Sequence, residues 1–188
     1  MIDTSSPFAY VGPEYPRWHQ TLSDGSWVLI RPIRHRDAQA ERDFIQALSA
    51  DSKRMRFLGQ MSCPTDEFID KLTDIDYVND VALAAVAEGN GKDRIVGVSR
   101  YAVDASRERC ECAVVVADEW QHKGLGTALM EKLIKIAQER GLRVMESTDL
   151  AENIEMRELA DYLGFDRRAD PDDVHQVIYS LPLNRSKV

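Results

Sequence analysis

The spacing of apolar positions divides the chain into segments with different secondary structure. Near the start, a short apolar run after an Asp24-Gly25 turn predicts a strand over residues 26–33. The following segments place apolar residues at the period of an amphipathic helix. They predict helices over residues 37–48, 52–58 and 65–72, the last with Thr65 as its N-cap.

The middle of the chain has the pattern of three strands joined by short polar turns. Residues 81–87 are a continuous apolar run of strand length, and residues 94–103 alternate between apolar and polar. A turn over residues 88–93 separates them. Residues 110–117 predict a third strand, which we expect to be buried on both faces in its second half. Strands joined in this way pair antiparallel, so the pattern predicts a meander.

The last third of the chain alternates between helix and strand. Gly141 and Gly164 each follow a helical pattern and supply its C-terminal stop. The predicted elements are a helix over 124–140, a strand over 142–147, a helix over 152–163 and a strand over 174–181. The whole order predicts a mixed α/β fold.

The length of 188 residues fits one domain with an arm. Residues 1–20 mix prolines and aromatic residues with little periodicity, and they predict an arm that lies on the domain or on a partner chain. A homodimer is therefore a candidate assembly. The domain itself is expected over residues 21–183, with a short tail over 184–188.

Charge and hydropathy exclude several classes of function. The chain has 24 Lys and Arg against 32 Asp and Glu, a formal net charge of -8. This balance argues against nucleic-acid binding, which needs a basic surface. The sequence has no apolar run of the length that crosses a bilayer, and its N-terminus lacks the pattern of a secretory signal.

The cysteines indicate packing rather than chemistry. Their number is odd, and no secretory signal accompanies them, so we expect a reduced, cytoplasmic protein. Cys110 and Cys112 form a C-x-C pair without a second Cys or His cluster, so no metal site is expected. On an alternating strand both sulfur atoms face the same side.

A basic, glycine-spaced loop at the start of a helix is the strongest chemical feature. Gly124 and Gly126 stand where glycine weakens a helix, so the backbone there is expected to approach a ligand closely. The first N–H groups of a helix have no intrahelical partner and form an anion site with the helix dipole. Lys123 adds a positive charge and His122 a donor, so the predicted ligand is a phosphate or pyrophosphate.

Three phosphate-binding patterns compete for this loop. The Walker A pattern is absent, and a dinucleotide fingerprint beginning at Gly124 fails because Leu129 takes the place of its third glycine. The third pattern, Gln121-x-x-Gly124-x-Gly126 after an apolar strand, resembles the cofactor-binding motif of the GNAT superfamily of N-acetyltransferases.

Two other segments strengthen the resemblance. AENIEMRELADYLGF, residues 151–165, is similar to the second motif of that superfamily. LSADSKRMRFLG, residues 48–59, resembles a segment of bacterial protein lysine acetyltransferases. The resemblance covers about residues 26–181 and implies a GNAT fold: a central mixed, mostly antiparallel sheet of six to seven strands with helices on both faces.

The resemblance also implies acetyl-CoA as co-substrate and assigns residues to it. The backbone of one strand would hold the pantetheine arm, the glycine loop the pyrophosphate, and an asparagine would contact the CoA arm. The matching residues are Val114, Val115, Val116, Gln121, His122, Lys123, Gly124, Leu125, Gly126, Thr127 and Asn153.

For catalysis, Glu111 is the candidate general base, because an ammonium must lose a proton before its nitrogen attacks a thioester. It matches the base proposed in the lysine acetyltransferases, and Glu146 is the second carboxylate to consider. A backbone N–H near Val116 would stabilise the oxyanion, which requires this strand to splay from its neighbour. Ala160 stands where many family members have a tyrosine general acid, and Tyr162 would point elsewhere, so water or direct departure of the thiolate must serve.

The sequence therefore predicts an acetyl-CoA-dependent N-acetyltransferase acting on a primary amine. The segment at residues 48–59 favours a protein lysine as acceptor, and a small amine or amino acid derivative is the alternative. A non-catalytic acyl-CoA-binding sensor is the alternative from another class, to which Ala160 gives weight.

Overall fold

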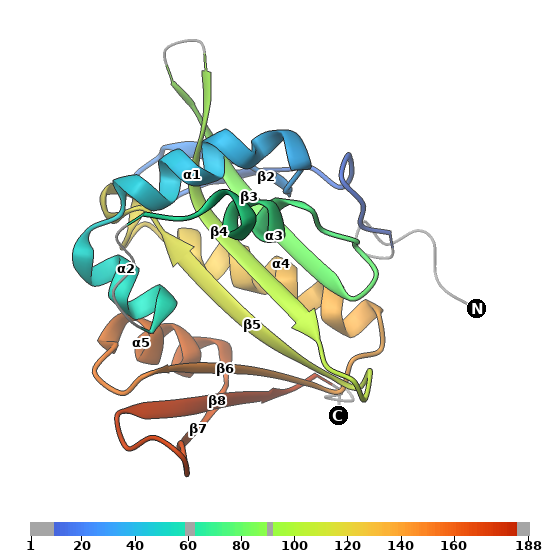
Figure 1. Cartoon of the computed structure of the whole chain (residues 1–188), viewed down its shortest axis with the longest axis vertical. Coiled ribbons are helices and arrows are strands. Elements are labelled where there is room, and N and C mark those ends of the chain that lie inside the picture. The colour runs from blue at the N-terminus through green and yellow to red at the C-terminus, as the bar shows by residue number, and fades with distance from the viewer. Residues whose placement is uncertain (1–9, 59–62, 90–91, 184–188) are drawn as a thin grey trace.

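The chain folds around one twisted sheet with helices on both of its faces (Figure 1). A computed structural model describes residues 10–58, 63–89 and 92–183. Within these ranges the sheet has eight strands in the order β1-β2-β3-β4-β5-β6-β8-β7. Neighbouring strands are antiparallel, except that β5 and β6 are parallel.

The elements follow one another along the chain largely as the apolar pattern predicts. The strands are β1 (Trp18–Thr21), β2 (Trp27–Pro32), β3 (Asp80–Gly89), β4 (Lys92–Val103), β5 (Arg109–Val116), β6 (Val144–Leu150), β7 (Asp166–Ala169) and β8 (Gln176–Pro182). The helices are α1 (Ala38–Ala47), α2 (Ala50–Phe57), α3 (Asp66–Thr73), α4 (Leu125–Glu139) and α5 (Ile154–Leu163), with short 3-10 turns η1 (His35–Asp37) and η2 (Asp118–Trp120).

Two apolar clusters lie on opposite faces of the sheet, and β3 contributes to both. Val81 and Leu83 belong to the cluster under α4, whereas Ala82 and Ala84 belong to the cluster under α1 and α3. Successive strand residues point to opposite faces, so a strand with helices on both sides must be apolar throughout. This explains the continuous apolar run over residues 81–87.

The predicted fold class is confirmed, and two edge strands raise the strand number above the expected six to seven. β1 takes the last residues of the predicted arm into the sheet, where Trp18 pairs with Ile30 of β2. β7 has four exposed residues and therefore no apolar alternation by which to recognise it. Both short strands depend on pairing with a neighbour rather than on a pattern of their own.

Other boundaries differ in detail. The strand predicted over residues 142–147 runs instead from Val144 to Leu150, because its polar end pairs with β8. Thr65 caps α3 as predicted: its hydroxyl accepts the Phe68 N–H at 3.2 Å. β3 ends at Gly89 and β4 begins at Lys92, so both strands reach into the predicted turn. The tip of that turn lies outside the described residues. The same is true of residues 1–9 of the arm and of the tail over 184–188.

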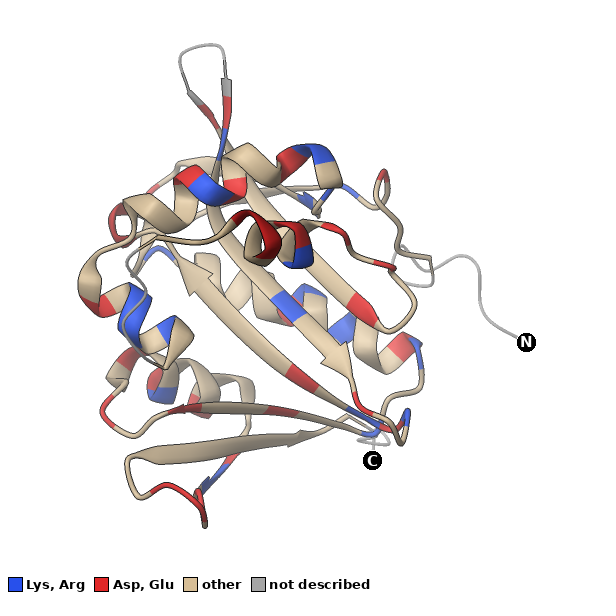
Figure 2. Ribbon diagram, viewed as in Figure 1, with Lys and Arg blue, Asp and Glu red and all other residues tan. Residues whose placement is uncertain are grey.

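Charged side chains are spread over the elements. In Figure 2 both signs of charge are distributed over the molecule, with basic positions on α2 and mainly acidic ones on α3, and no continuous basic stripe crosses this view. Among residues 10–58, 63–89 and 92–183, no helix combines the length and apolar character needed to cross a bilayer.

Candidate active site

The parallel strand pair β5 and β6 opens into a cleft. β5 and β6 are paired only from Arg109 with Val144 to Glu111 with Glu146. Beyond that point β5 continues to Val116, while β6 continues as the partner of β8. In Figure 1 the two strands start together and diverge toward the side on which α2 and α5 lie. The splay that the sequence analysis requires is therefore present.

A cavity of about 650 Å³ occupies the region between the diverging strands. Its walls come from β5, from the loop before α4 and the start of that helix, from α5, from α2 and from the end of β6. The lining residues are Ser49, Asp51, Ser52, Met55, Arg56, Val114, Val115, Val116, Asp118, Gln121, His122, Gly124, Leu125, Gly126, Thr127, Asp149, Glu152, Asn153, Ile154, Glu155, Met156, Glu158, Leu159 and Tyr162.

Most of the residues expected at the cofactor lie together in this cavity. Val114–Val116, Gln121, His122, residues 124–127 and Asn153 all line it. The second half of β5 is half-buried, so the prediction that it is buried on both faces is wrong. The reason is the splay, which removes the neighbouring strand and exposes Val114, Val115 and Val116 to the cavity.

Lys123 does not line the cavity with its neighbours in the loop. Its Nζ lies 2.9 Å from the Asp24 carboxylate, beside the turn before β2, and 5.0 Å from the centre of the Trp120 ring. Hydrogen bonds from Ser26, together with Lys123, lower the pKa of Asp24 below its usual value. The Lys123 charge is thus paired at the back of the loop.

Glu111 and Glu146 also lie apart from the cavity lining. Glu111 is exposed and is the last β5 residue that pairs with β6, so it marks the closed end of the cleft. Glu146, its partner in register, forms an ion pair of 2.6 Å with Arg109. That contact gives Glu146 a role in holding the two strands together.

The glycine loop has the backbone geometry of an anion site. Gly124 is the N-cap of α4 and has a φ of 81°, which favours glycine. The first hydrogen bond of the helix joins the Ala128 N–H to the Gly124 carbonyl. The N–H groups of residues 125–127 precede this bond, and all three residues line the cavity.

Gly126 is not required by protein packing. A Cβ atom at this position would lie 3.7 Å from Leu159 and 3.9 Å from Val116, which are ordinary contact distances. Gly97 on β4 is different, because a Cβ there would lie 3.0 Å from Leu129. The missing side chain at Gly126 therefore leaves space in the cavity rather than space for another part of the chain.

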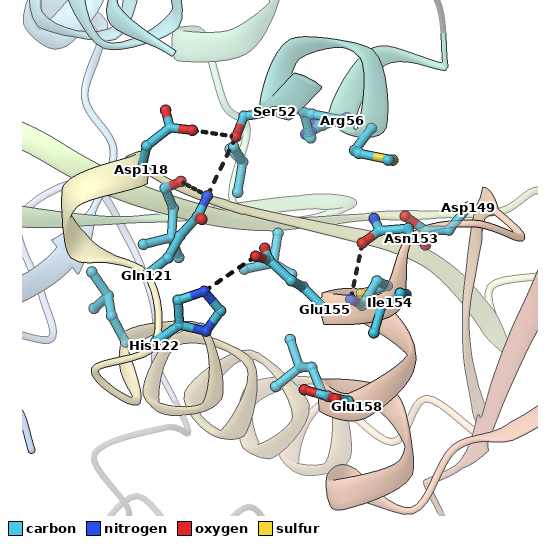
Figure 3. Close-up of a pocket in the computed structure, with 18 of the residues that line it drawn as sticks. Ser52, Arg56, Asp118, Gln121, His122, Asp149, Asn153, Ile154, Glu155 and Glu158 are labelled. Carbon is cyan, nitrogen blue, oxygen red and sulfur yellow. Dashed lines mark hydrogen bonds and ion pairs between the residues drawn. The ribbon is translucent and has the colours of Figure 1, made fainter. Parts of the chain in front are cut away.

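Two predicted cofactor residues have structural hydrogen bonds. The Gln121 side-chain amide donates to the Val116 carbonyl at 3.2 Å and to the Ser52 hydroxyl at 3.3 Å. Asn153 is the N-cap of α5, and its Oδ1 accepts the Met156 N–H at 3.0 Å (Figure 3). Both side chains fix the walls of the cavity.

Residues 48–58, which include α2, are tied to the loops that border the cavity. Ser49 and Ser52 donate through their hydroxyls to the Asp118 carboxylate, at 2.6 and 2.9 Å, and Ser49 also caps α2. The Ser52 contact is drawn in Figure 3. At the other side of α2, Arg54 pairs with Glu152 at the start of the α5 region. This set of contacts holds α2 over the open end of the cleft.

Asp149 is a cavity residue that the sequence analysis did not identify. It lies near the end of β6, is half-buried, and accepts a hydrogen bond of 2.6 Å from the Ser147 hydroxyl. Burial raises the pKa of Asp149 to about 6, with a further contribution from the negative charge of Glu111, while the Ser147 hydrogen bond and Arg56 oppose the shift. Its position just before the AENIEM motif was the only signal in the sequence.

Arg56 is the cationic side chain that α2 contributes to the cavity. Burial and the nearby Arg100 lower the pKa of its guanidinium to about 10. Arg100 itself pairs with the buried Glu41 at 3.0 Å. The charges of Glu41, Asp149 and Glu111 act on Arg56 in the opposite direction.

Three further features match the sequence analysis. Cys110 and Cys112 are buried in the same cluster, and burial raises the pKa of both thiols. Ala160 lies on the buried face of α5 and is fully buried, whereas Tyr162 of the same helix is 73% exposed. Tyr162 therefore lies on a different face of the helix from Ala160, although it reaches the rim of the cavity.

Fold and cavity together define a class of protein. Residues 45–165 match the acetyltransferase (GNAT) family, and this match covers more than half of the sequence. The chain belongs to the GNAT family of acetyltransferases and is an N-acetyltransferase of the EC 2.3.1 class. Acetyl-CoA is the co-substrate of this family.

Individual relatives agree with this assignment. The chain is 45% identical over 179 residues to Acetyltransferase PA5475 of Pseudomonas aeruginosa, with 95% of each chain covered. It is similar in structure to the GNAT domain of S. lividans PAT, with a TM-score of 0.81 and 26% identity over 90% of this chain and 99% of that one. The protein yncA from Salmonella typhimurium, solved with its cofactor acetyl-CoA, shares the fold, with a TM-score of 0.64 and 21% identity over 87% of this chain and 98% of that one.

The position of Asp149 predicts a pH-dependent effect on stability. The folded state raises its pKa from 3.8 to about 6, so protonation stabilises the fold below about pH 4, and this stabilisation is lost as the pH rises through about 6. Asp149→Asn imitates the protonated carboxyl. The free energy of unfolding of the variant minus that of the wild type should therefore be about 1–2 kcal/mol larger at pH 7 than at pH 4.

Chemical denaturation at the two pH values measures this difference. The matched control is Asp161→Asn, an exposed aspartate of α5 outside the cavity. An Asp149→Asn difference that is the same at both pH values would show that Asp149 ionises as freely in the folded state as in the unfolded chain.

Proposed function

We propose that the chain transfers the acetyl group of acetyl-CoA to the side-chain amine of protein lysines. The observation that carries the cofactor part is the continuity of the cavity: it joins the start of α4 to the splayed half of β5. A phosphate at one end and an extended arm along the strand match these two parts. The acetyltransferase domain is proposed to span residues 21–183.

At the phosphate end, the backbone of residues 122–127 is proposed to hold the pyrophosphate. The N–H groups of Leu125, Gly126 and Thr127 supply donors, and the helix dipole favours the negative charge. His122 is proposed to contribute from the mouth of the loop, where its Nε2 lies 3.3 Å from the Glu155 carboxylate (Figure 3). Lys123 is proposed to act through its backbone only, since Asp24 holds its side chain.

Along β5, the backbone of Val114, Val115 and Val116 is proposed to bind the pantetheine arm. Peptide groups that would bond to β6 in a complete sheet lack that strand beyond Glu111. An extended arm with amide groups satisfies them much as an added strand does. Asn153 and Gln121 support the same arm from the two sides of the cavity.

The acceptor side of the proposal rests on charge and on the segment over residues 48–59. A net charge of -8 and carboxylates along the cavity favour a cationic acceptor such as a lysine ammonium. The resemblance of LSADSKRMRFLG to protein lysine acetyltransferases points the same way. We further propose a cytoplasmic protein that binds neither nucleic acid nor membrane, and a homodimer as its candidate assembly.

Proton transfer is proposed to end at Glu111. It lies at the closed end of the cleft but does not line the cavity, so water must connect it to the reacting amine. Ala160 is buried and supplies no proton, so the thiolate of CoA takes its proton from water.

Gly126→Ala separates binding from folding. Alanine is favoured over glycine in a helix by about 1 kcal/mol, and its methyl group meets only ordinary contacts, so the variant should be at least as stable as the wild type. The same methyl group would occupy the space proposed for the pyrophosphate. Titration calorimetry should show the acetyl-CoA affinity reduced by at least about tenfold, or about 1.4 kcal/mol. Unchanged affinity would place the phosphates elsewhere.

Turnover tests the proposal itself. The full chain, mixed with acetyl-CoA and poly-L-lysine, should release CoA as a free thiol. A thiol-reactive reagent measures this release. Release with small amines but not with poly-L-lysine would support the small-molecule alternative. Binding of acetyl-CoA without release on any amine would identify a sensor.

A further inference from the structure

We propose that Asp149 is the group that binds the acceptor ammonium and takes its first proton, and that Arg56 is its positioning residue. This inference rests on the proposed transfer to an amine. It adds a carboxylate inside the cavity between the acceptor and Glu111, which lies outside the lining.

Strand register places Asp149 beside the proposed acyl arm. Glu111 and Glu146 are the last paired residues of β5 and β6, and Val114 and Asp149 each follow three residues later. Alternation along each strand gives Val114 and Asp149 the face opposite to that of Glu111 and Glu146. Both residues line the cavity that opens where the two strands diverge.

One carboxylate oxygen of Asp149 is held and the other is available. Oδ2 accepts the Ser147 hydroxyl at 2.6 Å, which fixes the orientation of the carboxylate. Within the described ranges, Oδ1 accepts no hydrogen bond from another residue. It is also not among the fully buried polar atoms that lack a partner, so a ligand can reach it. Figure 3 shows Asp149 next to Asn153, where α5 begins, facing the region below α2.

The charges around Asp149 come from several elements. Arg56 on α2 and Glu111 on β5 act on it directly, with opposite signs. Asp149 in turn raises the pKa of the buried Cys112 on β5, and of Tyr179 on β8, although burial is the larger cause for both. With a pKa of about 6, Asp149 is ionised at neutral pH yet is a stronger base than an ordinary aspartate.

Arg56 is well suited to positioning because α2 is fixed. The hydrogen bonds of Ser49 and Ser52 to Asp118 hold one end of the helix, and the Arg54–Glu152 pair holds its side. Arg56 thus presents a cation at a constant place opposite Asp149. It keeps the carboxylate ionised without being close enough to form a direct ion pair.

The proposed transfer removes two protons from the acceptor nitrogen. Asp149 takes one proton from the acceptor ammonium, which leaves a neutral amine. The amine nitrogen attacks the thioester carbonyl carbon, so that the C–N bond forms and the C–S bond breaks. The second nitrogen proton goes to water, the CoA thiolate gains a proton from water, and the proton on Asp149 leaves toward Glu111 and solvent. The net products are the amide, the free thiol and one proton.

Two acceptors distinguish proton removal from other roles. Poly-L-lysine is protonated at neutral pH, whereas hydroxylamine is largely unprotonated and needs no base before it attacks. Asp149→Asn should lower kcat with poly-L-lysine by about 10²–10⁴-fold and kcat with hydroxylamine by less than about tenfold. Its acetyl-CoA affinity should equal that of the wild type.

The pH profile provides a second readout. In the wild type, kcat/KM with poly-L-lysine should fall below about pH 6, and this limb should be absent in Asp149→Asn. Arg56→Gln should shift the limb to higher pH, because removal of the cation raises the pKa of Asp149. Asp149→Glu should recover part of kcat together with an acid limb. Glu111→Gln should lower kcat but keep the limb.

Each outcome has one meaning. Equal losses with both acceptors, loss of acetyl-CoA binding in Asp149→Asn, or a limb that disappears only in Glu111→Gln would overturn the role of Asp149 while leaving the transferase intact. A wild-type protein that binds acetyl-CoA but transfers to neither acceptor would overturn the proposed function, and this inference with it. Asp161→Asn, outside the cavity, should behave as the wild type throughout.

Discussion

The structure depends on one constraint: backbone groups in a sheet need hydrogen-bond partners, and β5 loses β6 as its partner partway along its length. Three residue pairs join them, after which β6 follows β8 and β5 continues alone beside β4. Unpaired backbone groups in a sheet are costly unless water, a side chain or a ligand satisfies them. Gln121 satisfies one of them through the Val116 carbonyl. The remaining edge is the feature around which α2, α4 and α5 are arranged.

The same parting creates the electrostatic character of the site. In the cleft, the carboxylate is desolvated enough to raise its pKa to about 6 but remains in contact with the cavity. Partly buried charges lower the stability of a fold, and groups with such shifts gather at functional sites.

Sequence alone predicted the parts of this protein that follow from local patterns. The period of apolar residues located the helices and inner strands, and the continuous run over 81–87 was a reliable sign of a strand covered on both faces. The glycine loop was identified from the helix start that it opens, because Gly124 and Gly126 stand together where glycine weakens a helix. The edge strands β1 and β7 escaped because four residues without alternation carry no pattern.

What the sequence did not show depends on distant residues. The apolar run of β5 predicts valines buried on both faces, because nothing local reveals that the neighbouring strand departs. Lys123 appeared to be a phosphate ligand, but Asp24, nearly a hundred positions earlier in the chain, holds it by an ion pair of 2.9 Å. Asp149 and Arg56 appeared ordinary, because their burial comes from the way α2 and β6 border the same cavity.

A crystal structure of the full chain with acetyl-CoA tests the central claim most directly. We expect the pyrophosphate within about 3 Å of the N–H groups of residues 125–127, and the arm along Val114–Val116. The thioester should lie between Val114 and Asp149, with Oδ1 of Asp149 facing the carbonyl carbon from the acceptor side. A cofactor bound outside the cleft, or a thioester remote from Asp149, would contradict this account.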